Sequence, residues 1–261
     1  MIRKDMMDLG LDGKVALVTG GSSGLGFGAA KALFLEGVSL VLLSRSKEKL
    51  TQATSELEAL RIDDHPTIIT IQANLDSPTA AAGVVDALRA DGTSPDILVA
   101  NSGGPKGGGY LDVTTTDLQE ALNGNFLAMA ELVRLLTPDM VERKWGRVVA
   151  ITSLWVRQPS PTLILSNAAR SALTAYLKTA ASELASFGVT INTVQPGLHL
   201  TDRLRTLYGA NVADAAAGLP SKSLGDADDF GKVVAFLCSG AARYINGVSL
   251  PVDGGLYQGL L

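Results

Sequence analysis

Short apolar runs alternate with stretches of helical periodicity along most of the chain. The apolar runs have the length of strands and are rich in β-branched residues, which predicts a series of buried strands. We expect these strands at Val15–Thr19, Val38–Leu43, Thr67–Ala73, Asp96–Ala100, Gly146–Ser153, Val189–Gln195 and Gly247–Val252.

The segments between these runs place apolar residues three and four positions apart, which is the spacing of one helix face. We expect helices from about Phe27 to Leu33 and over Lys47–Leu60, Ser77–Leu88, Thr116–Thr137, Pro161–Phe187 and Asp226–Ser239. The helix Pro161–Phe187 is rich in alanine and apolar on nearly every side, so we expect it to be buried. Leu198–Leu219 has helical patches but no clear boundary.

Strict alternation of strand and helix predicts an α/β fold. The expected architecture is a doubly wound parallel sheet of about seven strands with helices on both faces. The chain has 261 residues and shows no linker, low-complexity segment or internal repeat. We therefore expect a single domain over residues 1–261.

Composition and charge exclude several other classes of protein. The net charge is −4, so no basic field favours nucleic acid or an anionic membrane. Cys238 is the single cysteine and lies in an apolar segment, which predicts a core thiol and no metal site. Met1–Leu11 lacks the apolar region of a secretory signal, and no run is long enough to span a bilayer. These features predict a soluble, cytoplasmic protein.

The turn after the first strand carries the clearest chemical signal. Gly20, Gly24 and Gly26 join the apolar run Val15–Thr19 to a helix of small residues. A strand, a glycine-rich turn and a helix N-terminus together present backbone N–H groups to a phosphate. Glycines also occur in ordinary turns, but the flanking strand and helix favour a dinucleotide site. A second glycine-rich stretch, Asn101–Gly109, follows the fourth strand and is expected to be a ligand-side loop rather than a linker.

These motifs, in this order, resemble the short-chain dehydrogenase/reductase family over nearly the whole chain. The family's motif T-G-x3-G-x-G is present from Thr19 to Gly26. The other matching positions are Asn101-Ser102-Gly103 for the family's N-A-G, Asn125 for its helix-borne asparagine, Pro196-Gly197 with Thr201 after the sixth strand, and Asp253–Gly255 near the end.

The resemblance implies a Rossmann-type sheet that binds a nicotinamide dinucleotide. It places Gly20, Ser22, Ser23 and Leu25 at the pyrophosphate and ribose, and Thr201 at the nicotinamide amide. The other cofactor-binding positions that it implies are Asn101, Gly103, Pro196 and Gly197. Asn74 stands where the family usually has an aspartate at the adenine amine, and its carbonyl oxygen can accept the same hydrogen bond. Leu75 would line the adenine pocket.

The end of the second strand indicates which dinucleotide is bound. NAD-specific sites place a carboxylate there for the ribose hydroxyls. This chain has Ser44-Arg45 and no acid. A guanidinium suits a 2′-phosphate because it carries a fixed charge and can donate two hydrogen bonds in a bidentate arrangement. The alternative is that Arg45 is a solvated surface residue. The sequence therefore favours NADP(H) over NAD(H).

The catalytic motif departs from the family pattern. The family has a serine, a tyrosine thirteen positions later and a lysine four further on. Here Ser153 is followed at those spacings by Ser166 and Arg170, in the word S-N-A-A-R. Tyr176 and Lys178 lack the four-residue spacing that would place them on one helix face. Some family members, often labelled 3-oxoacyl-carrier-protein reductases, resemble this chain in the word S-N-x-x-R, so Ser166 and Arg170 could also be a functional replacement pair.

The replacement removes the usual proton donor. A tyrosine hydroxyl has a pKa of about 10 that a nearby cation can lower, whereas a serine hydroxyl is a far weaker acid. Arg170 keeps its proton and cannot replace the lysine in a relay, but it can hold ribose hydroxyls or an anion. Candidate substitute acids are His199, Tyr110 and Lys106. Each also has a plain interpretation: a surface loop residue, a loop anchor and a solvated charge, respectively.

Three functions remain open. The first is an NADP(H)-binding oxidoreductase acting on a carbonyl/alcohol pair, such as a 3-oxoacyl thioester or another ketone, with an atypical proton-donor site. Ser153, Ser166, Arg170 and Asn125 would be its catalytic residues. The alternative is a catalytically degenerate, NADP(H)-binding regulatory or structural subunit. The third is reduction of a substrate that needs no proton at the tyrosine position, such as an iminium or an activated alkene, which has no direct support.

The substrate side and the assembly are less constrained. Trp155, Val156, Pro159 and a lid within residues 198–219 suggest apolar walls around a small-molecule substrate. The arginines that could bind an anionic substrate, or be solvated, are Arg157, Arg203 and Arg205. In this family the helices that match Thr116–Thr137 and Pro161–Phe187 form a four-helix bundle between subunits, which implies a homotetramer or at least a dimer.

Overall fold

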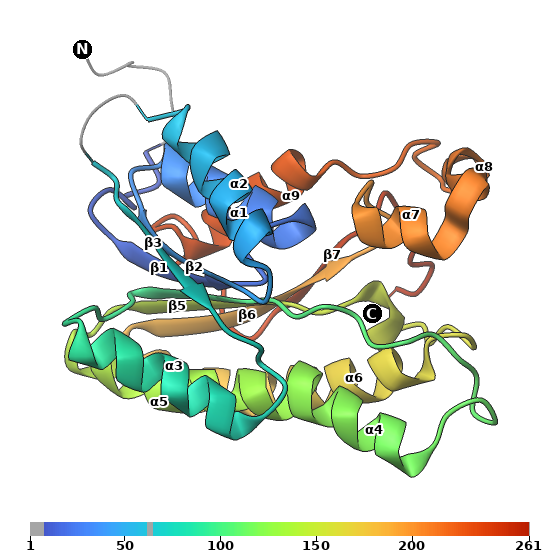
Figure 1. The fold of residues 1–261 in the computed structure, drawn as a ribbon, viewed down its shortest axis with the longest axis horizontal. Helices are drawn as coiled ribbons and strands as arrows, with labels where there is room; N and C mark the ends of the chain where they lie inside the picture. The colour runs from blue at the N-terminus through green and yellow to red at the C-terminus, as the bar shows by residue number, and fades with distance from the viewer. Residues whose placement is uncertain (1–7, 62–64, 261) are drawn as a thin grey trace.

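The computed structural model describes residues 8–61 and 65–260, so only the part of Met1–Leu11 from residue 8 is described. Its centre is a seven-stranded parallel sheet with the strand order β3-β2-β1-β4-β5-β6-β7 (Figure 1). The strands are β1 (Val15–Thr19), β2 (Ser39–Ser44), β3 (Ile68–Gln72), β4 (Ile97–Ala100), β5 (Gly146–Ile151), β6 (Val189–Pro196) and β7 (Ser249–Val252). The predicted fold class is confirmed.

The central strands are apolar along their whole length because helices cover both faces of the sheet. In β1, β4 and β5 nearly every residue is buried. The bounds differ from the predicted ones by one or two residues, except for β1, where they agree. The predicted strand Gly146–Ser153 was too long at its end: β5 stops at Ile151, which leaves Ser153 in the connection that follows.

Two layers of helices enclose the sheet, and each has its own apolar core (Figure 1). One layer holds α1 (Gly24–Leu35), α2 (Lys47–Glu58) and α9 (Ala227–Cys238). The opposite layer holds α3 (Pro78–Ala90), α4 (Thr115–Leu122), α5 (Ala128–Glu142) and α6 (Ile164–Leu184). Cys238 is buried in the first core, as predicted, and burial raises the pKa of its thiol to about 12.

The predicted helix Thr116–Thr137 is three elements in the structure. A π-helical turn, Asn123–Leu127, separates α4 from α5. The prediction also ended the helix too early, because α5 continues to Glu142 with Pro138 inside it. Pro138 has no backbone N–H, so the helix lacks the hydrogen bond that this position would donate to the oxygen of Arg134. Arg89 of α3 donates a hydrogen bond of 2.9 Å to the neighbouring oxygen of Leu135.

The other long helix, predicted over Pro161–Phe187, starts later than expected. Leu163 pairs with Gly108 of the glycine-rich loop, so α6 begins at Ile164. A short 3₁₀ segment, Ala185–Phe187, follows its end. Within one chain α6 is buried along a stripe rather than on every side, and Tyr176 on its outer face is 36% exposed.

The segment without a clear boundary, Leu198–Leu219, contains two short helices, α7 (Asp202–Tyr208) and α8 (Val212–Ala217). They extend beyond the end of the sheet, near the C-terminal part of the chain (Figure 1). Thr201 caps α7 by accepting a hydrogen bond of 3.4 Å from the backbone N–H of Leu204. None of the helices in the described part of the chain is long and apolar enough to cross a membrane.

Candidate active site

A cleft of about 1210 Å³ opens at the carboxyl ends of the strands, where the strand order reverses between β1 and β4. Such a reversal separates the loops that follow two neighbouring strands and leaves room for a ligand. All of the candidate cofactor-binding and catalytic residues that the sequence indicates line this cleft. The fold therefore brings together residues from the turn after β1, the ends of β2 to β6, and the helices α4 to α7.

The glycine turn after β1 suits a phosphate group. Gly24 has φ +56°, which a residue with a side chain rarely adopts. A Cβ at Gly26 would lie 2.2 Å from the backbone oxygen of Gly20, so only glycine lets α1 approach the turn this closely. Ser23 precedes α1 but its side chain caps none of the first N–H groups. These N–H groups and the positive end of the helix can therefore face a bound anion.

The end of β2 holds a positive charge and no carboxylate. The Ser44 hydroxyl accepts a hydrogen bond of 2.7 Å from the Ser22 hydroxyl, which ties the end of β2 to the glycine turn. The guanidinium of Arg45 reaches across the mouth of the cleft, where a Cβ on Gly103 would lie 4.0 Å from Nη2. Arg45 forms no ion pair with another described residue.

The adenine-side positions that the resemblance implies also lie in the cleft. Leu75 and Asn74 line it just beyond the end of β3. The amide nitrogen of Asn74 donates to Asp76 at 2.6 Å, so its carbonyl oxygen is the group that remains to accept a hydrogen bond. Asn101 follows β4, and its backbone N–H donates to the Thr19 hydroxyl at 2.8 Å. This bond fixes the loop after β4 against the end of β1.

Asn125 sits in the π-helical turn between α4 and α5. Such turns often occur at functional sites because they shift the helix register and turn a side chain inward. Asn125 is buried and lines the cleft, and its Oδ1 has no hydrogen-bond partner among the described residues. A buried acceptor without a partner is costly, so we expect this oxygen to accept a hydrogen bond from water or a ligand.

Ser153 lies two residues beyond the end of β5 and begins the short 3₁₀ segment Leu154–Val156. Its hydroxyl oxygen accepts a hydrogen bond of 3.2 Å from the backbone N–H of Trp155. This contact leaves the hydroxyl proton available for donation. Ser153 can therefore donate a hydrogen bond to a carbonyl oxygen in the cleft.

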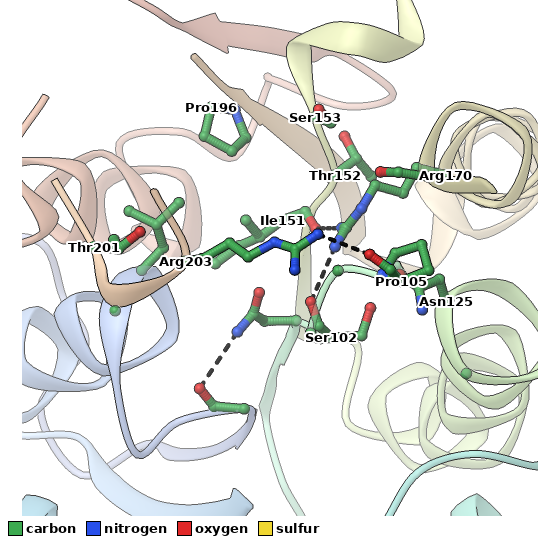
Figure 2. Close-up of a pocket in the computed structure, with 18 of the residues that line it drawn as sticks. Ser102, Pro105, Asn125, Ile151, Thr152, Ser153, Arg170, Pro196, Thr201 and Arg203 are labelled. Carbon is green, nitrogen blue, oxygen red and sulfur yellow. Dashed lines mark hydrogen bonds between the residues drawn. The ribbon is translucent and has the colours of Figure 1, made fainter. Parts of the chain in front are cut away.

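Ser166 and Arg170 lie one turn apart on the buried face of α6 and line the cleft. The guanidinium of Arg170 donates to two backbone oxygens, to Ile151 at 2.8 Å and to Ser102 at 3.0 Å. These bonds join the ends of β4 and β5 (Figure 2). Burial, with a smaller effect of the nearby Arg203 charge, lowers the pKa of Arg170 to about 10, so the side chain is still protonated at neutral pH.

No tyrosine of the described chain takes the position of Ser166. Tyr110 is 75% exposed and lies outside the cleft, so its interpretation as a loop anchor was wrong. Tyr176 packs edge-on against Phe126, with ring centroids 6.0 Å apart. Tyr208, at the end of α7, lines the cleft from the lid. The register that places Ser166 and Arg170 thirteen and seventeen positions after Ser153 thus fits the described helix.

The other two candidate acids are held by their surroundings. His199 is only 6% exposed and packs edge-on against Phe230 at 5.1 Å, so its interpretation as a surface residue was wrong. Burial lowers the pKa of His199, which favours its neutral form. Lys106 forms an ion pair of 2.6 Å with Asp117 and lowers the pKa of that carboxyl to about 2. Lys106 is therefore paired rather than simply solvated.

The structure also distinguishes the three arginines, Arg157, Arg203 and Arg205, that the sequence offered equally as ligands for an anionic substrate. Arg203, on α7, lines the cleft, whereas Arg205 on the same helix does not. Arg157 lies outside the cleft, where it donates to the backbone oxygen of Ser249 at 2.7 Å and lies over the ring of Tyr257. Of the apolar residues predicted at the substrate side, Trp155 and the lid residues Leu198, Leu204 and Leu207 line the cleft, whereas Val156 and Pro159 do not.

Comparison with known proteins shows which family the chain resembles. The chain matches the family model described as short chain dehydrogenase over residues 14–210. It is 30% identical over 252 residues to the 3-oxoacyl-[acyl-carrier-protein] reductase FabG of Salmonella typhimurium, covering 96% of this chain and 100% of the relative. It is 32% identical over 248 residues to dehydrogenase/reductase SDR family member 4 of Homo sapiens, covering 94% and 88% of the two chains.

A solved structure agrees with the fold as well. L-sorbose reductase from Gluconobacter frateurii, complexed with NADPH and L-sorbose, has a TM-score of 0.90 to this chain at 28% sequence identity. The match covers 97% of this chain and 100% of that chain.

Proposed function

The chain belongs to the short-chain dehydrogenase/reductase family of oxidoreductases, and we propose that it uses NADP(H) to interconvert a ketone and an alcohol without a tyrosine acid. The observation that supports this most directly is the continuity of one cleft. It joins an uncapped glycine turn and Arg45 at one end to the free hydroxyl proton of Ser153 at the other. Dinucleotide binding and carbonyl polarisation are thus available in one site.

NADP(H) is favoured over NAD(H) by the charge at the end of β2. The first N–H groups of α1 suit the pyrophosphate, and the unpaired Arg45 guanidinium suits a 2′-phosphate. A carboxylate that would bind free ribose hydroxyls is missing at Ser44-Arg45. The residues present therefore fit the phosphorylated dinucleotide, which supplies or accepts the hydride when it is bound.

The chain's own residues would act on the oxygen of the substrate. Ser153 donates a hydrogen bond to the carbonyl, and Ser166 offers a second hydroxyl from α6. Arg170 has N–H groups beyond the two that bind Ile151 and Ser102, and these can hold ribose hydroxyls or an anion. Reduction adds a hydride to the carbonyl carbon and a proton to its oxygen. Since neither Ser166 nor Arg170 is a competent acid, we propose that the negatively charged oxygen left by hydride addition takes this proton from bulk solvent, relayed by water at the open end of the cleft, and that the solvent buffer restores the proton.

The curated relatives suggest the substrate range to test. One is described as a 3-oxoacyl-[acyl-carrier-protein] reductase, and a solved structural relative is described with L-sorbose bound. Both substrates are ketones. We therefore propose a ketone or 3-oxoacyl thioester as the oxidised substrate of this chain.

A second function is compatible with the same contacts. The Arg170 guanidinium is engaged with two backbone oxygens, so it stabilises the cleft whether or not a reaction occurs. A chain that binds NADP(H) but performs no turnover, and that acts as a regulatory or structural subunit, would keep the same contacts.

Oxidation of NADPH by the purified chain, across a panel of ketones, 3-oxoacyl thioesters and quinones, tests the proposal. A Ser166→Tyr/Arg170→Lys double variant runs beside it. Turnover by the unmodified chain supports an oxidoreductase with a substitute proton source. No turnover by the unmodified chain and a gain in the double variant would instead support the binding subunit. Lack of NADPH binding in a titration would contradict both.

We also propose a homotetramer, or at least a dimer, built on the outer faces of α4 to α6. Leu127 in the π-helical turn is 39% exposed and Tyr176 on α6 is 36% exposed, which suits contact with another copy. Light scattering after size-exclusion chromatography would give the mass, and Tyr176→Glu should lower it. A cytoplasmic location stays a prediction from the sequence.

A further inference from the structure

We propose that the ketone substrate is an oxo acid and that its carboxylate binds to Arg203 of the lid helix α7, beside the fixed guanidinium of Arg170. This inference rests on the proposed function and adds the class of substrate to it. It concerns the part of the cleft beside the loop after β4, where Arg203 and Arg170 approach each other (Figure 2).

The charges of the cleft divide into paired and unpaired groups. Lys106 is paired with Asp117 at 2.6 Å, and Lys49 with Asp202 at 3.8 Å. The three arginines that line the cleft, Arg45, Arg170 and Arg203, have no ion-pair partner among the residues that the structure describes. Three unpaired guanidiniums in one cleft predict three anionic groups or one extended polyanion.

The dinucleotide accounts for only part of this charge. Its 2′-phosphate belongs to Arg45 at the end of β2, and its pyrophosphate to the uncapped N-terminus of α1. Arg170 lies one turn from Ser166 on α6, and Arg203 lies on α7, whose N-cap Thr201 is next to the glycine turn at Gly24. With the phosphates of the dinucleotide bound by Arg45 and the α1 N-terminus, these two guanidiniums can take a further anion, and the substrate is the remaining molecule of the reaction.

Arg203 is exposed, but the loop after β4 holds its guanidinium over the cleft. Its Nη2 donates to the backbone oxygen of Pro105 at 2.7 Å, across from the lid to the loop after β4. The guanidinium lies against Gly104, where a Cβ would be only 3.0 Å from Nη2. Glycine at this position leaves the space in which the arginine lies. Only one hydrogen bond to another described residue fixes the group, so other N–H groups can take a carboxylate.

Arg170 supplies a second positive charge that cannot move away. Both of its Nη atoms are anchored to backbone oxygens deep in the cleft, and the charge of Arg203 contributes to the lowered pKa of Arg170. Two like charges repel each other, and an anion between or beside them removes that repulsion. A bound anion therefore lowers the electrostatic energy of Arg170 and Arg203 relative to the cleft without it.

The anchoring of Arg170 also limits the distance between the carboxylate and the reacting carbonyl. Its Nη1 binds the oxygen of Ile151, two residues before Ser153. A ketone polarised by Ser153 and a carboxylate held beside Arg170 therefore belong to one short molecule. This geometry favours 2-oxo and 3-oxo acids over long neutral ketones.

The experiment compares oxo acids with their neutral esters: pyruvate with methyl pyruvate, and acetoacetate with methyl acetoacetate. The proteins are the unmodified chain, Arg203→Met, and Arg205→Met as the matched control, because Arg205 has the same charge on the same helix outside the cleft. We expect the unmodified chain to prefer the acids in kcat/KM. Arg203→Met should lower kcat/KM about 10- to 100-fold for the acids, the range for a lost charge-assisted hydrogen bond, and leave that for the esters nearly unchanged.

Arg205→Met should behave like the unmodified chain. A preference for the esters, or an equal loss on acids and esters, would overturn the inference. So would a rise in the Kd for NADPH in Arg203→Met as large as the loss in kcat/KM, because Arg203 would then serve the pyrophosphate.

A binding measurement separates this inference from the proposed function. Calorimetry with pyruvate and acetoacetate, on the chain saturated with NADP+, needs no turnover. Binding that is lost in Arg203→Met but kept in Arg205→Met supports the anion site even if no substrate is reduced, and the oxidoreductase proposal alone would then fail. Reduction of esters without any binding or reduction of the acids would overturn the inference and leave the oxidoreductase proposal in place.

Discussion

The two ends of the cleft differ in which atoms make the site. At the cofactor end, the glycine turn presents backbone N–H groups, and the family motif is complete from Thr19 to Gly26. At the proposed catalytic end, side chains must act on the substrate, and Ser166 and Arg170 stand where the family motif has a tyrosine and a lysine. The comparison teaches that anion binding by the backbone does not depend on the side chains that transfer a proton. The glycine motif for the anion can persist while the residues at the proton-donor positions change.

The proposed catalytic end is also more tightly fixed than a lost active site would need to be. Arg170 joins the loop after β4 to the end of β5, and Arg203 reaches from α7 to the same loop. Each guanidinium thus holds backbone of that end while keeping donors free for a ligand. The catalytic end is therefore organised around positive charge, where the family pattern organises it around a phenol.

The largest effect should come from the cofactor end. In Gly26→Ala the new Cβ would lie 2.2 Å from the backbone oxygen of Gly20, so the turn must move. We expect NADPH affinity to fall by about 100-fold or more, because the N–H groups lose their alignment. Fluorescence titration with NADPH measures this.

The matched control for Gly26→Ala is Gly83→Ala in α3, where a Cβ meets nothing within 4 Å. It should leave NADPH affinity unchanged and raise stability by about 0.5–1 kcal/mol. If Gly26→Ala also unfolds the chain, Gly24→Ala tests the same turn without a steric overlap, since its Cβ would be 3.5 Å from the nearest atom of Thr201 and only the φ of +56° would strain the alanine. Unchanged affinity in a folded Gly24→Ala chain would show that the turn does not hold the dinucleotide.

The next effect sharpens the comparison at the catalytic end. Arg170→Met leaves the oxygens of Ile151 and Ser102 without their donor, and each buried orphan costs about 1–3 kcal/mol. Relief of the repulsion with Arg203 offsets part of this cost, so we expect a net loss of about 2 kcal/mol in the free energy of unfolding. Urea denaturation measures it.

Ser166→Ala is the control for Arg170→Met. The Ser166 hydroxyl has no hydrogen bond to another residue that the structure describes, so its loss should change stability by less than about 0.5 kcal/mol. Equal destabilisation by the two substitutions would contradict the view that the hydrogen bonds of Arg170 to Ile151 and Ser102 stabilise this end.

A smaller effect is expected for the choice of dinucleotide. Arg45→Ala should raise the Kd for NADPH about 10-fold, the value of one charge-assisted hydrogen bond, and leave that for NADH within about twofold. Lys47→Ala is the control, because Lys47 is an exposed cation close by in the chain that does not line the cleft. A parallel loss of NADPH and NADH affinity would mean that Arg45 does not recognise the 2′-phosphate.

Most of the fold could be predicted from the sequence because its signals are local. The apolar runs gave every strand of the described sheet to within one or two residues, and the glycine turn followed from the strand and helix around it. Asn125 and Ser153 were predicted from their spacing in the family motif, and both line the cleft. The spacing is informative because it reflects the fold that the family shares.

The remainder depends on packing between distant parts of the chain, which periodicity does not encode. Nothing in the spacing of Arg203 and Arg205 shows which one faces the cleft, because α7 is short and had no clear boundary. His199 follows Pro196-Gly197 in what reads as a loop, yet Phe230 of α9 covers it. The π-helical turn at Asn125 has no sequence signal that distinguishes it from the helix on either side.

The smallest effect concerns His199, which lies at the base of the lid between the two ends. Burial lowers its pKa in the folded chain below the value of about 6.5 in the unfolded chain. The neutral form is thus favoured by folding, and its stabilisation is present above about pH 6.5 and lost as the pH falls toward the folded value. We expect the melting temperature to fall between pH 7 and pH 5, and this fall to be weaker in His199→Gln. His65→Gln, which removes an exposed histidine, should keep the slope of the unmodified chain. A slope that His199→Gln leaves unchanged would show that burial of His199 does not cause the loss of stability between pH 7 and pH 5, since Asp117, with its pKa of about 2, loses its stabilisation only at lower pH.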